Sequence, residues 1–235
     1  MTYQGGTASN IQLGALPWRL MLSANGVLYL AMNPRVEFLS EKSMYRQLQS
    51  SIIRVLDVSA AVVGLILFSP LLLIIGVAIR KTSAGPAVFA QPRVGRYERE
   101  YICYKLRTMY VETRSVGTHE VSRSAITPIG RFLRRTKIDE LPQLWNVLRG
   151  DMSLVGPRPG LPVQSALIEA RRRLGVFAVR PGVTGPAQVK QVDMSEPERL
   201  ALLDCRFAHD PTVIGYLKYV LMTVVGRGQG DRVRG

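Results

Sequence analysis

The sequence predicts a mostly helical α+β protein that inserts into a membrane, and three observations lead to this class. One uncharged apolar segment, Val58–Ile79, is long enough to enter a bilayer. Two short segments rich in β-branched and aromatic residues, Ala87–Gly95 and Glu100–Met109, predict the strands of a β-hairpin. Residues 127–150 then combine helical spacing of charged side chains with helix start and stop signals.

Composition narrows the class of protein further. The chain has 235 residues, of which 47% are apolar and 20% charged, so it can bury a core and is neither disordered nor of low complexity. Two cysteines, Cys103 and Cys205, are too few for a disulfide framework and favour a reducing compartment. The formal net charge of +14 indicates an anionic partner: nucleic acid, anionic lipid or a phosphorylated substrate.

The chain divides into three regions. Residues 1–50 form an N-terminal extension of unknown role. Within it the moderately apolar run Ile11–Met32 contains Pro17, Arg19 and Asn25, which makes it unsuitable as a membrane span and predicts a helix at the surface. Residues 51–81 form the membrane helix with its basic flanks, and residues 82–235 form a soluble domain.

The membrane segment allows two topologies. Val58–Ile79 has 22 residues, about 33 Å as a helix, against a bilayer core of about 30 Å. Arg54 precedes it and Arg80 and Lys81 follow it, so the distribution of basic residues gives no orientation. Ser69-Pro70 near its centre can kink the helix, because proline removes a backbone donor. The residues alone leave open a straight span or a kinked helix that returns to the same face.

Basic side chains follow the membrane segment in two clusters. Lys105 and Arg107 are two residues apart on the second predicted strand and therefore point to the same face. Arg131, Arg134 and Arg135 share one face of the next helix. Either cluster alone is typical of a solvated surface. Together they flank an acidic pair, which favours an anionic substrate.

That acidic pair is Asp139-Glu140. Asp139 occupies the N-cap position of a predicted helix that has Pro142 in its first turn and ends at Gly150. Structural capping alone would account for this spacing. Two adjacent carboxylates at a helix N-terminus, with arginines nearby, also suit phosphoryl chemistry in which one carboxylate is the nucleophile and the other holds Mg²⁺. The loop that follows fixes Arg158 between Pro157 and Pro159, either as a stiff phosphate ligand or as a solvated turn.

Ordered motifs from Arg54 to Val225 resemble those of the bacterial sugar transferases, the monotopic phosphoglycosyl transferases. The residues that carry this resemblance are Arg54 and Asp57, Ser69-Pro70, GPAVFAQPRVG (85–95), YKLRTM (104–109), TKIDELPQLWNVLRGDMSLVGPRP (136–159) and RPGVTGPAQV (180–189). The resemblance implies a re-entrant Ser-Pro helix in the bacterial inner membrane and surface amphipathic helices. It also implies that residues 82–235 are a catalytic domain on the cytoplasmic face.

The resemblance also implies a reaction. Such enzymes transfer a sugar 1-phosphate from a nucleoside diphosphate sugar, usually a UDP-sugar, to undecaprenyl phosphate, the first membrane step of exopolysaccharide, O-antigen or glycoconjugate assembly. By this resemblance Asp139 is the nucleophile that forms a covalent phosphosugar adduct, and Glu140 helps to bind Mg²⁺. The side chains expected to hold phosphates or nucleotide are Lys105, Arg107, Arg158, Gln91, Arg93 and the adjoining Pro157. The expected partners are both substrates, membrane lipids and, as a possible partner, a second copy of the chain.

Two departures from the family pattern and two rival classes remain. The family has Gly-Trp-Ala-Gln-Val-Asn-Gly where this chain has Gly-Pro-Ala-Gln-Val-Lys-Gln at 185–191, and Ile53 replaces a basic residue before Arg54. The altered loop keeps open a catalytically weak or silent scaffold. A membrane-tethered nucleic-acid binder is disfavoured, because aromatic residues make up 7% of the chain and no helix-turn-helix, zinc-finger or RNP-like pattern occurs.

Overall fold

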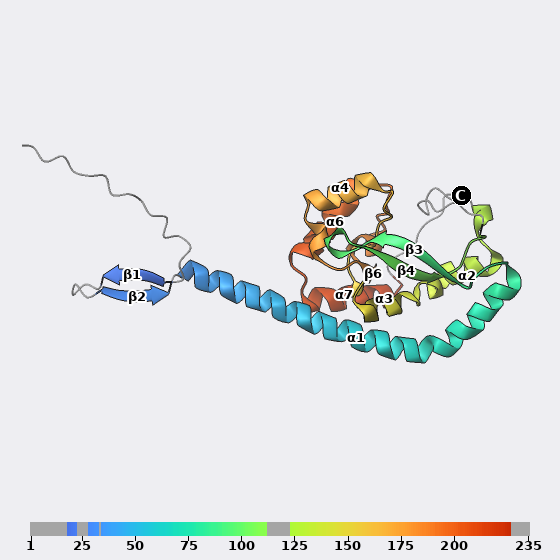
Figure 1. Ribbon diagram of the computed structural model, residues 1–235, viewed down its shortest axis with the longest axis horizontal. Helices are drawn as coiled ribbons and strands as arrows, with labels where there is room; N and C mark the ends of the chain where they lie inside the picture. Colours follow the sequence, from blue (N-terminus) through green and yellow to red (C-terminus); the bar gives the residue numbers. More distant parts are fainter. Residues whose placement is uncertain (1–17, 23–27, 33, 112–122, 227–235) are drawn as a thin grey trace, which may run out of the picture. The chain divides into compact units, whose positions relative to one another are not determined.

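A computed structural model describes residues 18–22, 28–32, 34–111 and 123–226, with side chains from residue 43 onward (Figure 1). The chain separates into two compact units, residues 1–48 and 49–235, which are described here one by one. Helix α1, Pro34–Thr82, begins in the first unit and continues into the second.

The first unit contains an antiparallel hairpin. Strand β1, Trp18–Leu22, pairs with β2, Leu28–Met32, so that Trp18 lies opposite Met32. The prediction of a surface helix over Ile11–Met32 is therefore wrong for the described part of that run. The Asn25-Gly26 dipeptide is a strong hairpin signal that the apolar pattern obscured.

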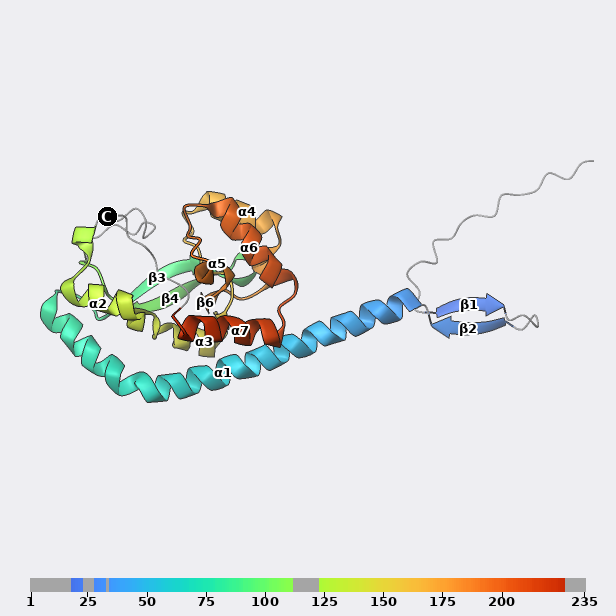
Figure 2. The ribbon, with the colours of Figure 1, turned by 180° about the vertical axis from the view of Figure 1, so that it is seen from behind.

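The second unit is built around the predicted hairpin, which the structure confirms. Strand β3, Val88–Val94, pairs antiparallel with β4, Glu100–Leu106, and a short 3₁₀ turn, Arg96–Glu98, joins them. In both views the hairpin lies between α1 and the pair formed by α4, Ser165–Arg173, and α6, Pro197–His209 (Figures 1 and 2).

The remaining elements are short. Helix α2 covers Pro128–Thr136 and α3 covers Gln143–Arg149. Strand β5, Ser153–Val155, pairs in parallel with β6, Gly182–Thr184. The other elements are 3₁₀ turns at Arg123–Ala125, Ile138–Glu140 and Val176–Ala178, and helices α5, Pro186–Val189, and α7, Val213–Val224.

Helix α1 packs on this domain with a narrow stripe and exposes the rest. Ala61 joins a buried cluster with Cys103, Val147 and Met152, while Ile75 and Ile79 pack against Leu106 and Leu133. The stretch Ser43–Thr82 is long and apolar enough to cross a membrane, with a mean hydropathy of 2.8 over 18 residues of which 11% are buried. Exposed side chains along it include Val63, Ile66, Leu67, Leu73 and Ile74.

Polar contacts fix α1 to the domain on the N-terminal side of the apolar segment. The Arg54 guanidinium donates to the Val147 and Leu148 carbonyls at 2.7 and 3.0 Å, where it caps α3. The carboxylate of Asp57 is 1% exposed. Its Oδ1 accepts hydrogen bonds from three donors: Ser153 Oγ at 3.0 Å, Leu154 N at 2.8 Å and Tyr216 Oη at 2.8 Å. Asp57 therefore joins α1 to β5 and to α7, which lies beside α1 (Figure 2).

We expect Asp57→Ala to destabilise the second unit by about 3 kcal/mol or more, since each buried donor left unpaired costs about 1–3 kcal/mol. Tyr216→Phe is the matched control, because it removes one of the three donors and should cost about 1 kcal/mol. Chemical unfolding of both variants in the same detergent measures the difference. Equal losses for the two variants would contradict the role of Asp57 as the common acceptor.

Candidate active site

The acidic pair lies in a 3₁₀ turn between two helices. Lys137 ends α2 in the left-handed conformation, with φ 59°, and the chain then forms the turn Ile138–Glu140. The expected N-cap role of Asp139 is wrong: α3 begins at Gln143, its cap position is Pro142, and no side chain caps it. The expected end at Gly150 is confirmed, with φ 92°. Capping therefore does not account for Asp139.

Asp139 is a buried carboxyl group that interacts with charged side chains of both signs. Asp139 is 8% exposed. Burial, and next the neighbouring Glu140, raise the pKa of Asp139 from 3.8 to about 6, against the opposing effect of Lys105, Arg134 and Arg158. An anion at Asp139 is thus poorly solvated yet close to three cations, which suits a nucleophile for a phosphorus centre.

Glu140 is held by two cations on separate elements. Its Oε1 lies 2.9 Å from Arg158 Nη2 and 3.7 Å from Lys105 Nζ. The side chains of Glu140 and Arg158 are each 11% exposed, and that of Lys105 is 17% exposed. The structure therefore brings together Asp139, Glu140, Lys105 and Arg158. These residues come from strand β4, the 3₁₀ turn and the proline loop, and Lys105 and Arg158 are 53 positions apart in the sequence.

Gln91 and Arg93 support the proline loop. They alternate on one face of β3, opposite Cys103 and Tyr101 in the register. Arg93 Nη2 donates to Gln91 Oε1 at 2.7 Å, and Arg93 Nη1 donates to the Pro159 carbonyl at 3.0 Å. The carbonyl of Pro157 accepts from Gly182 N at 2.9 Å. These contacts hold the loop on both sides of Arg158 and fix the position of its guanidinium.

Arg107 lies elsewhere. Its guanidinium donates to the carbonyls of Ser83 and Ala84, to the Ser83 hydroxyl and, at 3.5 Å, to the Ile79 carbonyl. Strand β4 ends at Leu106, one residue before Arg107. The prediction that Lys105 and Arg107 point to the same face of one strand is therefore wrong. Among its described contacts Arg107 fixes the C-terminal end of α1, and its expected phosphate-binding role stays a prediction.

The altered 185–191 loop packs behind the proline loop. Gly156 N donates to the Thr184 carbonyl at 2.9 Å, and a Cβ at Gly185 would overlap the Gly156 carbonyl, so only glycine fits there. Gln191 adopts φ 59°, a conformation that favours the glycine found in the family pattern. The loop therefore keeps Gly185 of the family pattern, where a Cβ would not fit, and differs from the pattern at Pro186, Lys190 and Gln191.

Two residues of the site were not predicted as functional. Arg134 was recognised only as part of a basic helix face, yet it contributes to the field at Asp139. Asn146 carries no local signal of a functional role, yet its side chain accepts from Tyr104 N at 3.1 Å and donates to the Ile102 carbonyl at 2.7 Å, which joins α3 to β4. Neither relation follows a local spacing rule, because each depends on elements that meet only in the fold.

The donor set fits a magnesium ion that takes most ligands from a substrate. No group of three His, Cys, Asp or Glu that could hold a metal occurs in the described part of the chain. Two adjacent carboxylates remain, Asp139 and Glu140. Mg²⁺ commonly binds one or two carboxylates together with substrate phosphates and waters. The pair is therefore adequate for Mg²⁺ bound with a diphosphate and inadequate for a site made of protein ligands alone.

The raised pKa of Asp139 predicts a pH-dependent difference in stability between the wild type and Asp139→Asn. Because the folded pKa, about 6, exceeds the ordinary 3.8, the folded state binds more protons, and wild-type stability falls as pH rises from about 4 through 6. The asparagine variant lacks this loss. In metal-free buffer its unfolding free energy should exceed the wild-type value by up to about 3 kcal/mol at pH 8 and by little at pH 4. A difference that does not grow between these pH values would contradict the burial of an ionised Asp139.

Comparisons with known proteins agree with the motifs. A family model described as bacterial sugar transferase matches residues 48–228. A UDP-glucose:undecaprenyl-phosphate glucose-1-phosphate transferase of Caulobacter vibrioides is 42% identical over 181 residues, 73% of this chain and 67% of the relative. An undecaprenyl-phosphate glucose phosphotransferase of Komagataeibacter xylinus is 38% identical over 184 residues, 73% of this chain and 35% of the relative.

A third relative acts on a different sugar. The UDP-N-acetylgalactosamine-undecaprenyl-phosphate N-acetylgalactosaminephosphotransferase of Aeromonas hydrophila is 41% identical over 143 residues, 58% of this chain and 33% of the relative. The chain thus spans about a third of the length of two of these relatives and two thirds of the other. Relatives named for glucose and for N-acetylgalactosamine match at similar identity.

Proposed function

The chain belongs to the bacterial sugar transferase family, and on that premise we propose that it transfers a sugar 1-phosphate from a UDP-sugar to undecaprenyl phosphate. The observation that carries this proposal is the buried Asp139 next to a Glu140 that Lys105 and Arg158 hold in place. A carboxylate nucleophile beside fixed cations is the arrangement that phosphoryl transfer through a covalent intermediate requires.

The reaction proceeds in two displacements at one phosphorus atom. An Oδ of ionised Asp139 attacks the β-phosphorus of the nucleotide sugar, and the bond from that phosphorus to the bridging oxygen breaks. UMP leaves with the electron pair, and the sugar phosphate is attached to Asp139 as an acyl phosphate. A phosphate oxygen of the lipid then attacks the same phosphorus. The aspartyl oxygen leaves as a carboxylate, and the product is undecaprenyl diphosphate sugar.

The neighbouring side chains serve this chemistry by charge and position. Arg158 and Lys105 lie where they can bind the substrate's phosphate oxygens while they keep Glu140 in place. Glu140, next to the nucleophile, would hold Mg²⁺, which neutralises diphosphate charge when bound. Gln91 and Arg93 position the proline loop. Burial of Asp139 keeps water away from the acyl phosphate, which would otherwise hydrolyse.

We further propose that α1 is re-entrant and that the catalytic domain lies on the cytoplasmic face of the inner membrane. The support is that the residues flanking the apolar segment contact the same domain. Before it, Arg54 binds α3, and after it, Ser83 and Ala84 bind Arg107. A straight crossing would put these ends on opposite sides of a core of about 30 Å. Inside the segment Pro70 lacks a donor, and Ser69 Oγ donates to the Ile66 carbonyl at 2.9 Å.

Cysteine labelling in intact cells tests this topology. With Cys205→Ser as background, Leu48→Cys and Lys81→Cys place exposed thiols on either side of the apolar segment. We expect both thiols to resist a membrane-impermeant maleimide and to react after the cells are permeabilised. If one flank is labelled in intact cells and the other is not, the helix crosses the membrane and the re-entrant proposal is wrong.

A catalytically silent scaffold is the second candidate, and the changed side chains at Pro186, Lys190 and Gln191 are the observation that favours it. Release of UMP by the purified protein, given undecaprenyl phosphate and a panel of UDP-sugars, separates the two candidates. The enzyme should release UMP with at least one sugar nucleotide, and the Asp139→Asn variant should not. A folded wild-type protein that releases none would be the scaffold.

A further inference from the structure

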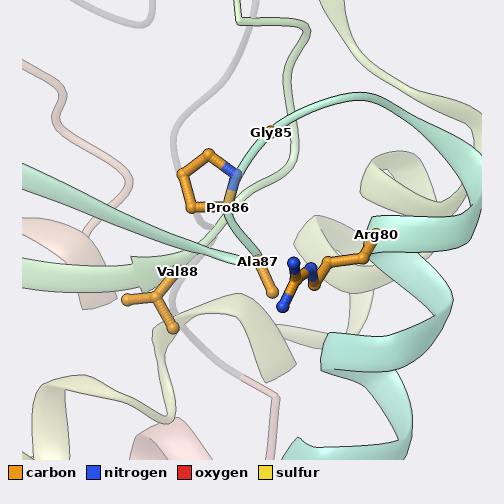
Figure 3. A pocket seen from close by; sticks show the side chains of 5 residues that line it. All are labelled: Arg80, Gly85, Pro86, Ala87 and Val88. Carbon is orange, nitrogen blue, oxygen red and sulfur yellow. The ribbon is translucent and has the colours of Figure 1, made fainter.

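A hollow lies at the C-terminal end of α1, outside the contacts of the acidic pair. It has a volume of ≈ 620 Å³ and is lined by Arg80, Gly85, Pro86, Ala87 and Val88. Figure 3 shows the Arg80 side chain extending from α1 toward Ala87, which Pro86 precedes and Val88 follows in the chain. The lining therefore comes from the last turn of the membrane helix and from the segment that leads into β3.

The lining combines one cation with apolar walls. Arg80 is exposed, and within the described residues its guanidinium has no hydrogen bond or ion pair with the protein. The other four residues offer hydrocarbon and backbone only. A guanidinium beside apolar walls complements a molecule with a phosphate at one end and a hydrocarbon chain at the other. The charge and the lining thus indicate an amphiphilic anion.

The hollow adjoins the surface that is available to lipid. On α1 the side chains of Leu73, Ile74 and Val77 are exposed, and on β3 Val88 is 44% and Phe89 41% exposed. Arginine at the end of an apolar helix lies at the depth of lipid headgroups, where its stem contacts acyl chains and its charge contacts phosphates. The hollow is therefore open to a lipid whose hydrocarbon chain stays in the bilayer.

The segments that line the hollow are linked through the fold to the segments that hold the acidic pair. Phe89, next to Val88 on β3, lies opposite Lys105, the residue 3.7 Å from Glu140. Ala87 packs in the same apolar cluster as Ile138, the residue before Asp139. Ala87 in the wall of the hollow and Ile138, the residue before Asp139, therefore belong to one packed cluster.

From these observations we propose that the hollow holds the phosphate end of the polyprenyl phosphate acceptor, with Arg80 bound to its phosphate and the first prenyl units against Ala87 and Val88. This inference rests on the proposed function for the identity of the lipid. A phosphate monoester carries close to two negative charges at neutral pH, whereas the phosphodiester of a common phospholipid carries one, so the Arg80 guanidinium favours the monoester.

A binding experiment tests the location of the lipid without turnover. The full chain in nanodiscs is irradiated with a polyprenyl phosphate that bears a diazirine on its first isoprene unit, and the labelled peptides are identified by mass spectrometry. We expect labelling of residues 82–93. An excess of unlabelled polyprenyl phosphate should suppress it, and the same excess of phosphatidylglycerol should not. Labelling confined to other peptides, or equal suppression by both lipids, would overturn the proposal.

Variants at neighbouring basic positions give the matched comparison. Arg80→Gln should lower labelling of residues 82–93 about tenfold, the effect expected for the loss of one charge-assisted hydrogen bond. Arg80→Lys should recover part of it. Lys81→Gln, which removes the next charge along the helix but does not line the hollow, should leave it unchanged. Equal losses for Arg80→Gln and Lys81→Gln would show general attraction to anionic membrane and refute a specific site.

Kinetics separate failure of this proposal from failure of the proposed function. The burst of UMP without a lipid acceptor reports the first displacement, and Arg80→Gln should leave it unchanged while it raises the KM for polyprenyl phosphate about tenfold. An unchanged KM would refute the acceptor site although the enzyme works. Absence of a burst in the wild type would refute the proposed function, and the labelling result would then still decide whether the lipid occupies the hollow.

Discussion

Asp139→Asn is expected to abolish turnover while the fold survives. Asparagine keeps the shape of the side chain but cannot form the acyl phosphate, so the rate of UMP release should fall at least about a thousandfold, or about 4 kcal/mol of barrier. Steady-state UMP release with the preferred UDP-sugar measures the loss. Glu140→Gln is the matched variant, because it retains the nucleophile and should leave a damaged but measurable rate.

The stability of the same variant supplies the control. Because burial raises the pKa of Asp139, Asp139→Asn should be at least as stable as the wild type above pH 6, so loss of activity cannot come from unfolding. A structural role alone predicts the opposite pattern, with activity retained in proportion to folded protein. Near-normal turnover in a stable Asp139→Asn variant would remove Asp139 as the nucleophile.

Removal of divalent cations has the second largest expected effect. With an excess of chelator the rate should fall at least about a hundredfold, because Arg158 and Lys105 are shared between Glu140 and the substrate and compensate only part of the diphosphate charge. Mg²⁺ should restore the rate, and Mn²⁺, which also prefers oxygen ligands, should restore part of it.

The fold itself gives the control for this prediction. The described site contains no protein-only metal cluster, so the unfolding midpoint should be the same with chelator and with Mg²⁺ in the absence of substrate. A loss of activity that parallels a loss of structure would indicate a structural metal. Full activity in chelator would show that the two carboxylates work without a divalent ion.

The sequence predicts the elements that depend on local pattern. The apolar segment, the β3–β4 hairpin and the end of α3 at Gly150 each follow from periodicity or turn chemistry within about twenty residues, and the structure confirms them. The strand pair β1–β2 also has a local signal in Asn25-Gly26, although the moderately apolar run around this dipeptide favours a helix.

The relations that position the site are not local. Arg54 meets the carbonyls of Val147 and Leu148 across 93 and 94 positions, and Asp57 meets Tyr216 across 159. Such pairs form only when apolar packing has set the elements side by side, so no spacing rule contains them. Arg107 is a further example. Its spacing from Lys105 predicts that both side chains point to the same face of the strand, but β4 ends at Leu106 and the Arg107 guanidinium binds the Ser83 carbonyl after α1.

Intact-protein mass spectrometry tests the central claim most directly. The wild-type protein is incubated with Mg²⁺ and its preferred UDP-sugar, without lipid acceptor, and then quenched in acid. We expect a mass increase of one sugar phosphate, located on Asp139 by peptide fragmentation, absent in Asp139→Asn and lost from the wild type when undecaprenyl phosphate is added. If UMP is released while Asp139 stays unmodified, or if the adduct lies on another residue, the mechanism proposed for this site is wrong.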